Sequence, residues 1–359
     1  MHASSRTYLI LPLLALGILG AACAALFPGA ARSVLGLPGP EPTLATLNMA
    51  PPGSLSLVAE PQDGVAPVLS LIQNASTSVD LVMYELTDSQ VEQALVDAKN
   101  RGVAVRVLLN EGYYGKQTGD YGASEPINQP AYEYLELHGI AVKWTPLYFA
   151  LTHQKTLVVD GHEALIMSFN LVPRYYATGR DFGIDDIDQS DVSAIEKTFT
   201  DDWAGVQESA PQGDDLLWSP GSKSVLLSLI ASASSTLEVY NEEMNDQDIE
   251  SALEAAAKRG VVVRVDMTYA TNWKPALAEL ASAGVLVRTY ASSSKDLYIH
   301  AKMILVDNHT AFVGSENFST GSLDDNRELG LVLSQHNIVA SLQTIFNDDW
   351  AQARPFVSQ

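Results

Sequence analysis

Cysteine is nearly absent from this chain of 359 residues, and positive charge is scarce. The single cysteine, Cys23, lies in an apolar N-terminal stretch, so the rest of the chain has no thiol for a disulfide, a zinc knuckle, an iron–sulfur cluster or a cysteine nucleophile. Against 43 Asp and Glu residues there are 21 Lys and Arg residues, which gives a formal net charge of −22. This balance disfavours partners held by a broad basic surface, such as duplex nucleic acid, but it permits a small, locally positive pocket.

Long apolar runs are also rare, and the one at the N-terminus, residues 8–27, carries no charge. It follows Arg6 and ends in small residues, as in an export signal, and it is long enough to span a bilayer as a retained anchor. We therefore expect residues 1–27 to be a signal peptide or a membrane anchor and residues 28–54 to be a linker. The protein is then expected outside the cytoplasm: secreted, periplasmic or anchored by this segment.

The remaining sequence consists of two similar copies, one after the other. Four segments recur in the same order, the first two displaced by 158 residues and the last two by 147: VLSLI at 68–72 and LLSLI at 226–230, KNRGVAVRV at 99–107 and AKRGVVVRV at 257–265, HQKTLVVD at 153–160 and HAKMILVD at 300–307, FTDDW at 199–203 and FNDDW at 346–350. A single repeat of this length predicts two homologous domains, which we place at residues 55–208 and 209–359.

Each copy alternates β-rich apolar runs with segments of helical periodicity. Strands are expected at 79–83 and 103–109 around a helix at 88–100, and in the second copy at 237–240 and 261–267 around a helix at 246–259. Strand–helix–strand units predict an α/β fold in which each copy is an α-β-α sandwich. The closing helices of the two copies are expected to begin at Ser190 and Asn337, whose side chains can cap a first-turn amide.

The segment HQKTLVVDGHEALIMSFN predicts a β-hairpin, with Gly161 and His162 as a two-residue loop. The second copy predicts the same hairpin with Asn308 and His309 in the loop. In that register each hairpin places a His opposite an Asn and a Lys opposite a Ser on one face: His153, Asn170, Lys155 and Ser168 in the first, and His300, Asn317, Lys302 and Ser315 in the second.

Such a set of side chains fits a phosphodiester. A neutral imidazole can attack phosphorus, while an ammonium, a hydroxyl and an amide can bind the phosphate oxygens. Two hairpins related by a pseudo-twofold axis supply two histidines, one neutral as the nucleophile and one protonated as the general acid. Asp181 and Glu328 each follow the motif asparagine by eleven residues, and each carboxylate can accept the other ring N–H of a catalytic imidazole.

The pattern His-x-Lys-x4-Asp followed by x6-Gly-Ser-x-Asn, complete in HAKMILVDNHTAFVGSEN at 300–317, resembles the motif of the phospholipase D superfamily. The resemblance covers nearly all of residues 55–355. It implies a phosphohistidine on His153, a general acid and base at His300, and no required metal or other cofactor. It further implies that phosphate is bound by Lys155, Lys302, Asn170 and Asn317. Water would resolve the intermediate by hydrolysis, and an alcohol would resolve it by transfer.

One residue departs from this motif. Met167 stands where the motif has glycine and where the second copy has Gly314. By strand parity it points behind the strand, so we expect it to reshape packing without removing a chemical group. Asp160 and Asp307 sit at the hairpin turns, facing away from the histidines, and we assign them, with Gly314, a structural role.

Aromatic residues are expected around the substrate. Tyr113 and Tyr114 lie in an insertion that precedes His153, and Trp273 lies at the related place in the second copy, so all three can line a substrate mouth. Ordinary surface tyrosines of a glycine-rich loop would give the same pattern, and this alternative stays open.

No metal is expected. The acidic run lacks the glycine and the final glutamate of a calcium-binding loop and is interpreted as a solvated approach to a helix: Asp185, Asp186, Asp188 and Asp191. Because one chain supplies both half-sites, we expect a monomer.

Together these features predict a phospholipase D-like phosphodiesterase that hydrolyses or transfers phosphatidyl groups at a membrane surface. Three alternatives remain: a metal-independent endonuclease of the same superfamily, a cardiolipin-synthase-like transferase, and a noncatalytic protein that binds phosphorylated ligands. The acidity counts against the nuclease, because gripping several phosphates needs clustered cations. The single apolar segment counts against the transferase, and the complete second motif counts against the binding protein.

Overall fold

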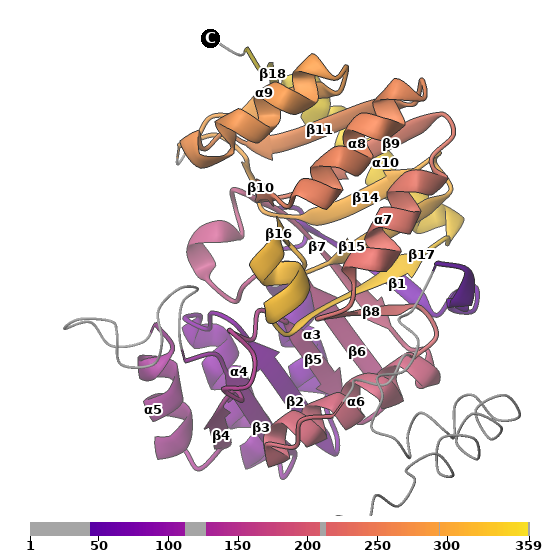
Figure 1. The fold of residues 1–359 in the computed structure, drawn as a ribbon. Helices are drawn as coiled ribbons and strands as arrows, with labels where there is room; N and C mark the ends of the chain where they lie inside the picture. Colours follow the sequence, from indigo (N-terminus) through magenta and orange to yellow (C-terminus); the bar gives the residue numbers. More distant parts are fainter. Residues whose placement is uncertain (1–43, 112–126, 209–212, 294, 358–359) are drawn as a thin grey trace, which may run out of the picture. The chain divides into compact units, whose positions relative to one another are not determined.

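Two eight-stranded sheets whose equivalent strands follow the same order dominate the computed structural model (Figure 1). The structure describes residues 44–111, 127–208, 213–293 and 295–357. In the first sheet the strands lie in the order β1 (Leu55–Glu60), β7 (Gly179–Asp186), β6 (Glu163–Met167), β5 (Thr156–Val159), β2 (Ser78–Met83), β3 (Ala104–Leu109) and β4 (Ala141–Trp144). In the second they lie in the order β8 (Leu216–Ser219), β17 (Glu328–Leu333), β15 (Thr310–Gly314), β14 (Lys302–Val306), β9 (Thr236–Tyr240), β11 (Val262–Thr268), β12 (Leu286–Tyr290) and β18 (Arg354–Pro355).

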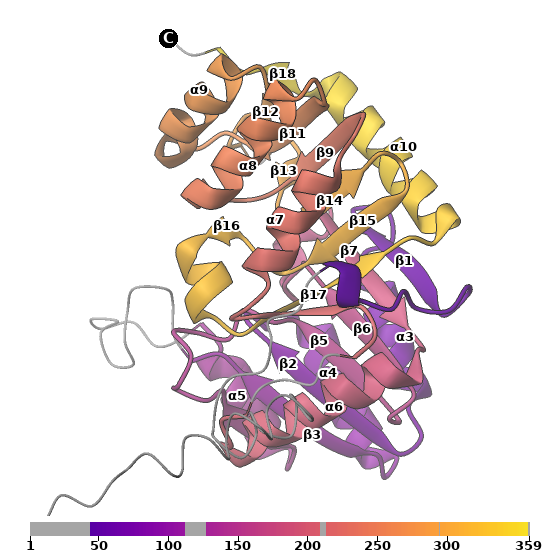
Figure 2. The same ribbon diagram turned by 45° about the vertical axis from the view of Figure 1, so that its right-hand side comes forward.

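Helices cover both sheets, as the strand–helix alternation predicts (Figure 2). The first half contributes α3 (Ala66–Asn74), α4 (Ser89–Asn100), α5 (Gln129–Leu137) and α6 (Gln189–Ala204). The second contributes α7 (Lys223–Ser232), α8 (Gln247–Lys258), α9 (Lys274–Ser282) and α10 (His336–Gln352). Short turns of helix complete the set: η1 (Leu44–Thr46), η2 (Pro173–Tyr175), η3 (Thr271–Trp273) and the π-helical η4 (Gly321–Asp325). The predicted α/β fold, with two homologous domains of this kind, is confirmed.

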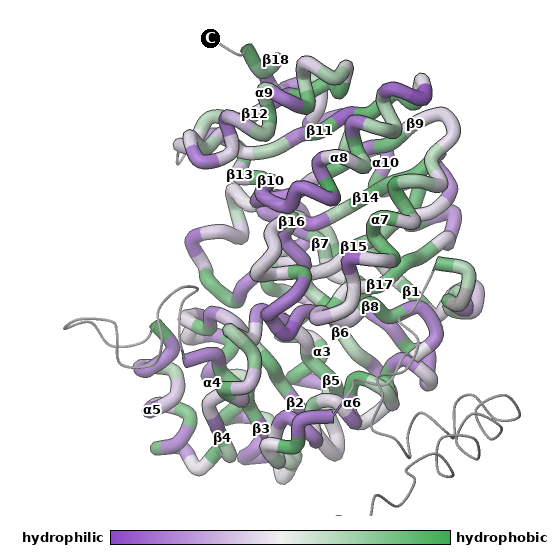
Figure 3. Tube along the Cα trace, viewed as in Figure 1, coloured by the Kyte–Doolittle hydropathy of each residue, from purple (hydrophilic) through white to green (hydrophobic). Residues whose placement is uncertain are grey.

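Three large apolar cores and one small cluster, Val82, Leu108 and Phe199, hold the described layers together. One lies between the first sheet and α3, α4 and α5, and another between the second sheet and α7, α8 and α9. The third is shared, because it combines inward residues of both sheets with α6 and α10. Figure 3 shows the apolar character of β14 and α7, which supply Ile304 and Leu229 to the second core. The shared core makes the two halves of residues 42–359 one compact unit.

The halves also exchange backbone pairs. Strand β13 (Tyr298–Ile299) of the second half adds in parallel to β7 of the first sheet. At the equivalent place of the first half, Thr152 forms a parallel bridge with Arg327. A small two-stranded sheet, β10 (Met244–Asn245) with β16 (Phe318–Ser319), lies within the second half.

Two local expectations are wrong. Helix α6 begins one residue after Asp188, whose side chain accepts from the Ser190 amide, so Ser190 lies inside the helix. Helix α10 follows Gln335, which makes no capping bond with its side chain, and Asn337 lies inside that helix as well. In both copies the helix begins before the polar residue that was expected to cap it.

The hairpin register is also shifted by one residue. Val159 pairs with Glu163, and Val306 pairs with Thr310, so each loop has three residues and not two. Asp160 and Asp307 enter these loops with positive φ values of 55° and 51°. Because the ladder of the first hairpin starts only at Thr156, strand parity does not determine where the motif side chains before it point.

The N-terminal expectations fall mostly outside the described residues. Part of the predicted linker is described, and it contacts the second half: the Ala50 amide donates to Asp215 Oδ2 at 3.0 Å, and the Asn48 amide donates to the Asp214 carbonyl. Among the described helices, none is long and apolar enough to cross a bilayer.

Candidate active site

Both motif histidines open onto one pocket of about 230 Å³. His153 is 8% exposed and His300 is 9% exposed, so each ring is largely shielded but accessible. The pocket lies where the chain leaves β2 and β9 and enters both hairpins. Its lining is Tyr84, Glu85, His153, Asn170, Tyr175, Glu242, Glu243, Tyr298, His300 and Asn317.

Each histidine is held by the carboxylate of the other half. His153 Nδ1 lies 2.8 Å from Glu328 Oε2, and His300 Nδ1 lies 2.8 Å from Asp181 Oδ1. A carboxylate at Nδ1 keeps the proton on that nitrogen and leaves Nε2 to carry the chemistry. The carboxylates predicted from their spacing are therefore in place, and the partnership crosses between the halves.

The backbone of each histidine is anchored across the halves as well. The amides of His153 and Gln154 both donate to the Arg327 carbonyl, and the amides of His300 and Ala301 both donate to the Arg180 carbonyl. These residues precede Glu328 and Asp181. One peptide segment thus positions both the carboxylate and the backbone of the histidine that it serves.

Ser168 and Ser315, both expected to bind substrate, are not among the residues that line the pocket of the two histidines. Both are fully buried. Ser168 Oγ donates to Asp181 Oδ1 at 2.6 Å, and Ser315 Oγ donates to Glu328 Oε2 at 2.7 Å. The one-residue shift in register explains the difference, because it moves each serine away from its expected place opposite the lysine. The hydroxyls orient the carboxylates that orient the histidines.

The two lysines are buried against the histidine backbone. Lys155 Nζ donates to the His153 carbonyl at 2.6 Å, and Lys302 Nζ donates to the His300 carbonyl. Lys155 also lies 5.2 Å from the centre of the Tyr84 ring. Burial and the charge of Lys302 outweigh the nearby carboxylates and lower the pKa of Lys155 to about 7.

His153 is electrically suited to act as a nucleophile. Burial, helped by the charge of Lys155, lowers the pKa of His153 to about 4, although Glu328 acts in the opposite direction. Burial would raise the pKa of Glu328, but His153 and Lys155 lower it, so this carboxyl is ionised. At neutral pH a neutral imidazole therefore sits beside a fixed carboxylate.

The two asparagines reach the pocket, and one of the predicted aromatic residues lines a second pocket beside it. Asn170 and Asn317 line it with 8% and 6% exposure. Trp273 lines an adjoining pocket of about 240 Å³ that shares His153 and Asn317 with the first. The other two predicted aromatic residues, Tyr113 and Tyr114, lie outside the described residues.

The motif aspartates stand at the hairpin turns and do not line the pocket that contains both histidines. Asp160 accepts from the backbone amides of Ser76, Thr77 and Ser78, which precede or begin β2. Burial opposes ionisation, but these amides lower its pKa to about 2. Asp307 accepts from Ser234, Ser235 and Thr236 in the same way before β9.

Glycine at 314 is required by close packing. A Cβ there would lie 2.6 Å from the Gly330 Cα and 2.8 Å from the Phe312 ring, and it would collide with Glu316. In the first half Met167 and Phe169 take the places of Gly314 and Glu316 and fill an apolar core without exposure. The departure from the motif is thus an exchange of packing behind the strand.

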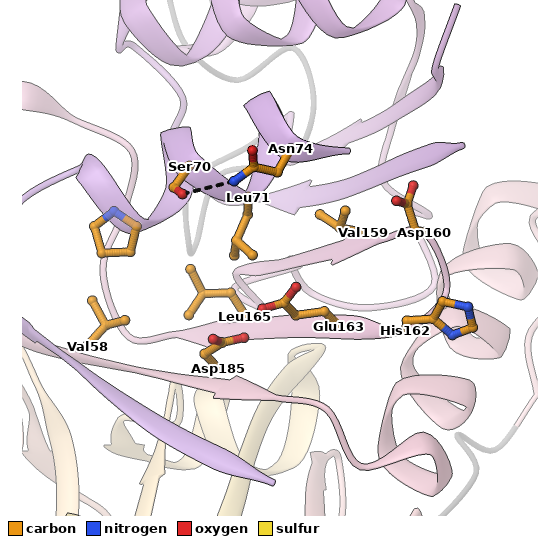
Figure 4. A pocket seen from close by; sticks show the side chains of 11 residues that line it. Val58, Ser70, Leu71, Asn74, Val159, Asp160, His162, Glu163, Leu165 and Asp185 are labelled. Carbon is orange, nitrogen blue, oxygen red and sulfur yellow. Dashed lines mark hydrogen bonds between the residues drawn. The ribbon is translucent and has the colours of Figure 1, made fainter. Parts of the chain in front are cut away.

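A larger hollow of about 430 Å³ opens at the first hairpin turn (Figure 4). The Glu163 and Asp185 side chains lie side by side in it, while Asp160 and His162 stand at its edge. Burial and their mutual proximity raise the pKa of Glu163, and burial raises that of Asp185. Three carboxyl groups are among its lining residues, and no lysine or arginine is, so this hollow is unsuited to phosphate.

Within the part of the chain that is described, no group of three or more His, Cys, Asp or Glu side chains is placed to hold a metal.

Several important residues were missed in the sequence. Arg180 and Arg327 form buried, bidentate ion pairs with Asp349 and Asp202 of the opposite half. The signal was available, because both aspartates belong to the repeated DDW triplet. Glu242 of the pocket carried no such signal, because nothing in the motif points to it.

Comparison with known proteins matches a family described as "Cardiolipin synthase, PLD-like domain" over residues 68–203 and again over residues 226–350. Cardiolipin synthase 2 of Bacillus cereus is 23% identical over 330 residues, covering 79% of this chain and 62% of that protein. Mitochondrial cardiolipin hydrolase of Danio rerio is 31% identical over 132 residues, covering 36% of this chain and 57% of that protein. The crystal structure of phosphatidylserine synthase from Haemophilus influenzae superposes with a TM-score of 0.67 at 11% identity, covering 86% of this chain and 89% of that one. This chain thus spans less than two thirds of the length of the curated relatives.

Proposed function

This chain belongs to the phospholipase D superfamily, and we propose that it transfers the phosphatidyl group of a phospholipid to an alcohol through a phosphohistidine on His153. The observation that carries the proposal is the pair of histidines on one pocket, each with Nδ1 held by a carboxylate of the other half. This arrangement directs two Nε2 atoms to the same reaction.

In the first step His153 Nε2 attacks phosphorus, forming an N–P bond as the bond from phosphorus to the leaving oxygen breaks. His300 donates its Nε2 proton to that oxygen. Lys155, Lys302 and Asn170 bind the phosphate oxygens, with Asn317 opposite. In the second step an alcohol gives its proton to His300 Nε2 and attacks phosphorus, and the N–P bond breaks.

The adjoining pocket supports transfer to an alcohol over simple hydrolysis. It meets the first pocket at His153, and hydroxyl and amide side chains form much of its lining: Asn245, Ser319, Thr320, Ser322 and Asn326. Such groups suit a hydroxylated acceptor. The relatives that are named cardiolipin synthases point the same way, and this alternative therefore replaces hydrolysis as the leading proposal.

Vesicles of phosphatidylglycerol test the proposal directly. We expect the purified protein to form cardiolipin and release glycerol in the presence of a chelator, as measured by lipid mass spectrometry. His153→Ala and His300→Ala should each abolish the product. Phosphatidic acid as the only product would show hydrolysis, and cleavage of plasmid DNA without lipid turnover would favour a nuclease. Lipid turnover that survives either substitution would refute the mechanism.

We further propose that this reaction takes place outside the cytoplasm, supported by the uncharged N-terminal segment, residues 8–27.

A further inference from the structure

The Glu242 side chain lies among the groups that would bind phosphate in the second half-site. Its Oε2 atom is 3.1 Å from Lys302 Nζ, 3.3 Å from His300 Nε2 and 3.4 Å from Asn317 Nδ2. Its other oxygen, Oε1, accepts from the Tyr298 hydroxyl at 2.5 Å. One carboxylate oxygen thus contacts an ammonium, an imidazole nitrogen and an amide, as a phosphate oxygen would.

This carboxylate is charged and reachable from the pocket. The Glu242 side chain is 27% exposed, whereas that of Lys302 is fully buried. Partial burial would raise the pKa of Glu242, but His300, Lys302 and the Tyr298 hydroxyl lower it far below its usual range. At neutral pH both the Glu242 carboxylate and a phosphodiester are anionic, so the two compete for the same cationic groups.

In the first half a tyrosine stands at the place equivalent to Glu242. Val82 pairs with Thr156 as Tyr240 pairs with Met303, so the structure makes Tyr84 the equivalent of Glu242. The Tyr84 ring lies edge-on to His153, with centroids 4.7 Å apart, and faces Lys155. The duplication therefore places an aromatic ring beside one pair of His and Lys and a carboxylate beside the other.

We propose that the Glu242 carboxylate occupies the place of a phosphate oxygen in the second half-site of the free protein, and that a phosphate group binds there only by displacing it. The inference rests on the proposed function in one respect: His300, Lys302 and Asn317 must be phosphate ligands. Its consequence is specific to the second half-site. Affinity for phosphate is held down by a side chain of the protein itself.

A purely structural role makes a different prediction. If Glu242 only neutralised the buried Lys302, its loss would lower stability and leave phosphate affinity unchanged or weaker. If it occupies the phosphate position, its loss would lower stability in buffer, raise phosphate affinity, and allow phosphate to restore the lost stability.

Titration calorimetry with inorganic phosphate on the full chain separates these cases. We expect Glu242→Gln to bind phosphate at least 10-fold more tightly than wild type. Glu243→Gln is the matched control: it removes a carboxyl group from the same pocket. Among the described residues no hydrogen bond or ion pair joins Glu243 to His300 or Lys302, so its effect should stay under about 3-fold. Thermal unfolding should show a larger phosphate-induced rise in Tm for Glu242→Gln than for wild type.

The reciprocal substitution guards against misfolding of the first variant. Tyr84→Glu places a second carboxylate beside Lys155 and should weaken phosphate binding at least 10-fold relative to Tyr84→Gln. Equal affinity in Glu242→Gln and wild type, or equal affinity in the two Tyr84 variants, would overturn the inference. So would absence of phosphate binding in every variant. Formation of cardiolipin by the wild type in that case would show that the proposed function survives while this inference does not.

Discussion

His153 and His300 hold equivalent places in the two halves but have different neighbours, and this difference supports the roles proposed for them. His153 stands beside Tyr84 and keeps an uncharged ring, because burial lowers its pKa to about 4. His300 has carboxylates at both ring nitrogens, Asp181 at Nδ1 and Glu242 at Nε2. The neutral ring suits attack on phosphorus, and we assign proton donation to the other histidine.

The pH profile of kcat/KM should reflect these neighbours. Activity requires neutral His153, so it should fall as pH drops through about 4. It also requires charged Lys155, whose pKa is lowered by burial to about 7, so activity should fall as pH rises above that value. Initial rates from pH 3 to 9 on a soluble phosphodiester give the profile. An acid limb near pH 6.5, the value of an ordinary histidine, would contradict the assignment of His153.

Leaving-group dependence should separate the two carboxylates. Glu328→Gln disturbs the nucleophile and should lower kcat by about 10²–10⁴-fold for every substrate. Asp181→Asn disturbs the proton donor, so its effect should shrink by at least 10-fold on bis(p-nitrophenyl) phosphate, whose leaving group needs no proton. Ser168→Ala, which removes the hydroxyl that donates to Asp181 and accepts from the Phe182 amide but leaves the carboxylate in place, is the milder control. Equal losses on good and poor leaving groups for both carboxylate variants would contradict the division of labour.

At the scale of single residues, the repeated motif predicts the site residues that belong to the motif itself and few others. The histidines and asparagines of both motifs line the pocket, and the lysines lie buried with Nζ bonded to the histidine carbonyls, because the spacing specifies a hairpin that gathers them. Ser168 illustrates the limit, since a register shift of one residue turns a predicted phosphate ligand into a support for Asp181. The contact of Glu242 with Lys302 could not be predicted from the sequence, because it depends on the pairing of strands β9 and β14, and the two residues are 60 positions apart.

Among the elements, the closing helices α6 and α10 do more than cover the sheets. Their last turns carry Asp202 and Asp349, which bind the arginines that precede the catalytic carboxylates of the opposite half. Tyrosine hydroxyls complete both sites, with Tyr148 donating to Asp202 and Tyr240 donating to Asp349. Each helix end therefore holds an arginine in place, and the residue that follows this arginine in the chain orients a histidine. The repeated DDW triplet is explained by this contact.

Breaking either ion pair should therefore destabilise the whole protein. All four side chains of these two ion pairs are at most 6% exposed: Arg180, Asp349, Arg327 and Asp202. Removing one partner of such a buried pair costs about 3–5 kcal/mol. We expect that loss for Asp349→Asn and for Asp202→Asn in urea unfolding. Glu254→Gln, which breaks the exposed pair with Lys258, should cost under about 1 kcal/mol. Similar small costs for all three variants would contradict this role.

The strand and helix segments were predictable because each carries its own periodicity, as β2, α4 and β3 show. The helix starts were not, because Ser190 and Asn337 are good caps in isolation while the chain enters both helices earlier. The hairpin loops gained a residue because Asp160 and Asp307 turn to bind the amides that start β2 and β9. That contact lies some 80 residues away in sequence for Asp160 and cannot be read from the turn itself.

At the scale of the molecule, acidity is concentrated in places that matter for stability. The acidic run before α6, predicted to be solvated, is in large part buried: Asp186 and Asp191 have no exposed surface, and Asp215 of the second half joins them. Asp191 Oδ1 accepts from the Asp214 amide, and Asp215 Oδ2 accepts from the Ala50 amide. Carboxyl groups from β7, α6 and the segment before β8 thus meet where the two halves and the N-terminal segment join.

This cluster makes stability fall as pH rises. Burial, reinforced by the neighbouring carboxylates, raises the pKa of Asp191 to about 6, of Asp186 to about 7 and of Asp215 to about 9. Between pH 4 and 9 the folded protein therefore binds more protons than the unfolded chain, so each rise in pH through this window favours unfolding.

Urea unfolding at pH 5, 7 and 9 measures how the free energy of unfolding changes with pH. Replacing one carboxyl group of the cluster by an amide tests whether the cluster causes this change. Asp215→Asn keeps an oxygen for the Ala50 amide and removes the charge that must otherwise form at high pH. It should raise stability at pH 9 by at least about 2 kcal/mol, since one pKa unit corresponds to about 1.4 kcal/mol, and it should leave stability at pH 5 nearly unchanged. Asp348→Asn, on an exposed position of α10, should leave the slope as it is. A wild-type protein equally stable at pH 5 and 9 would show that these carboxyls ionise without cost, and hence that the junction is open to water.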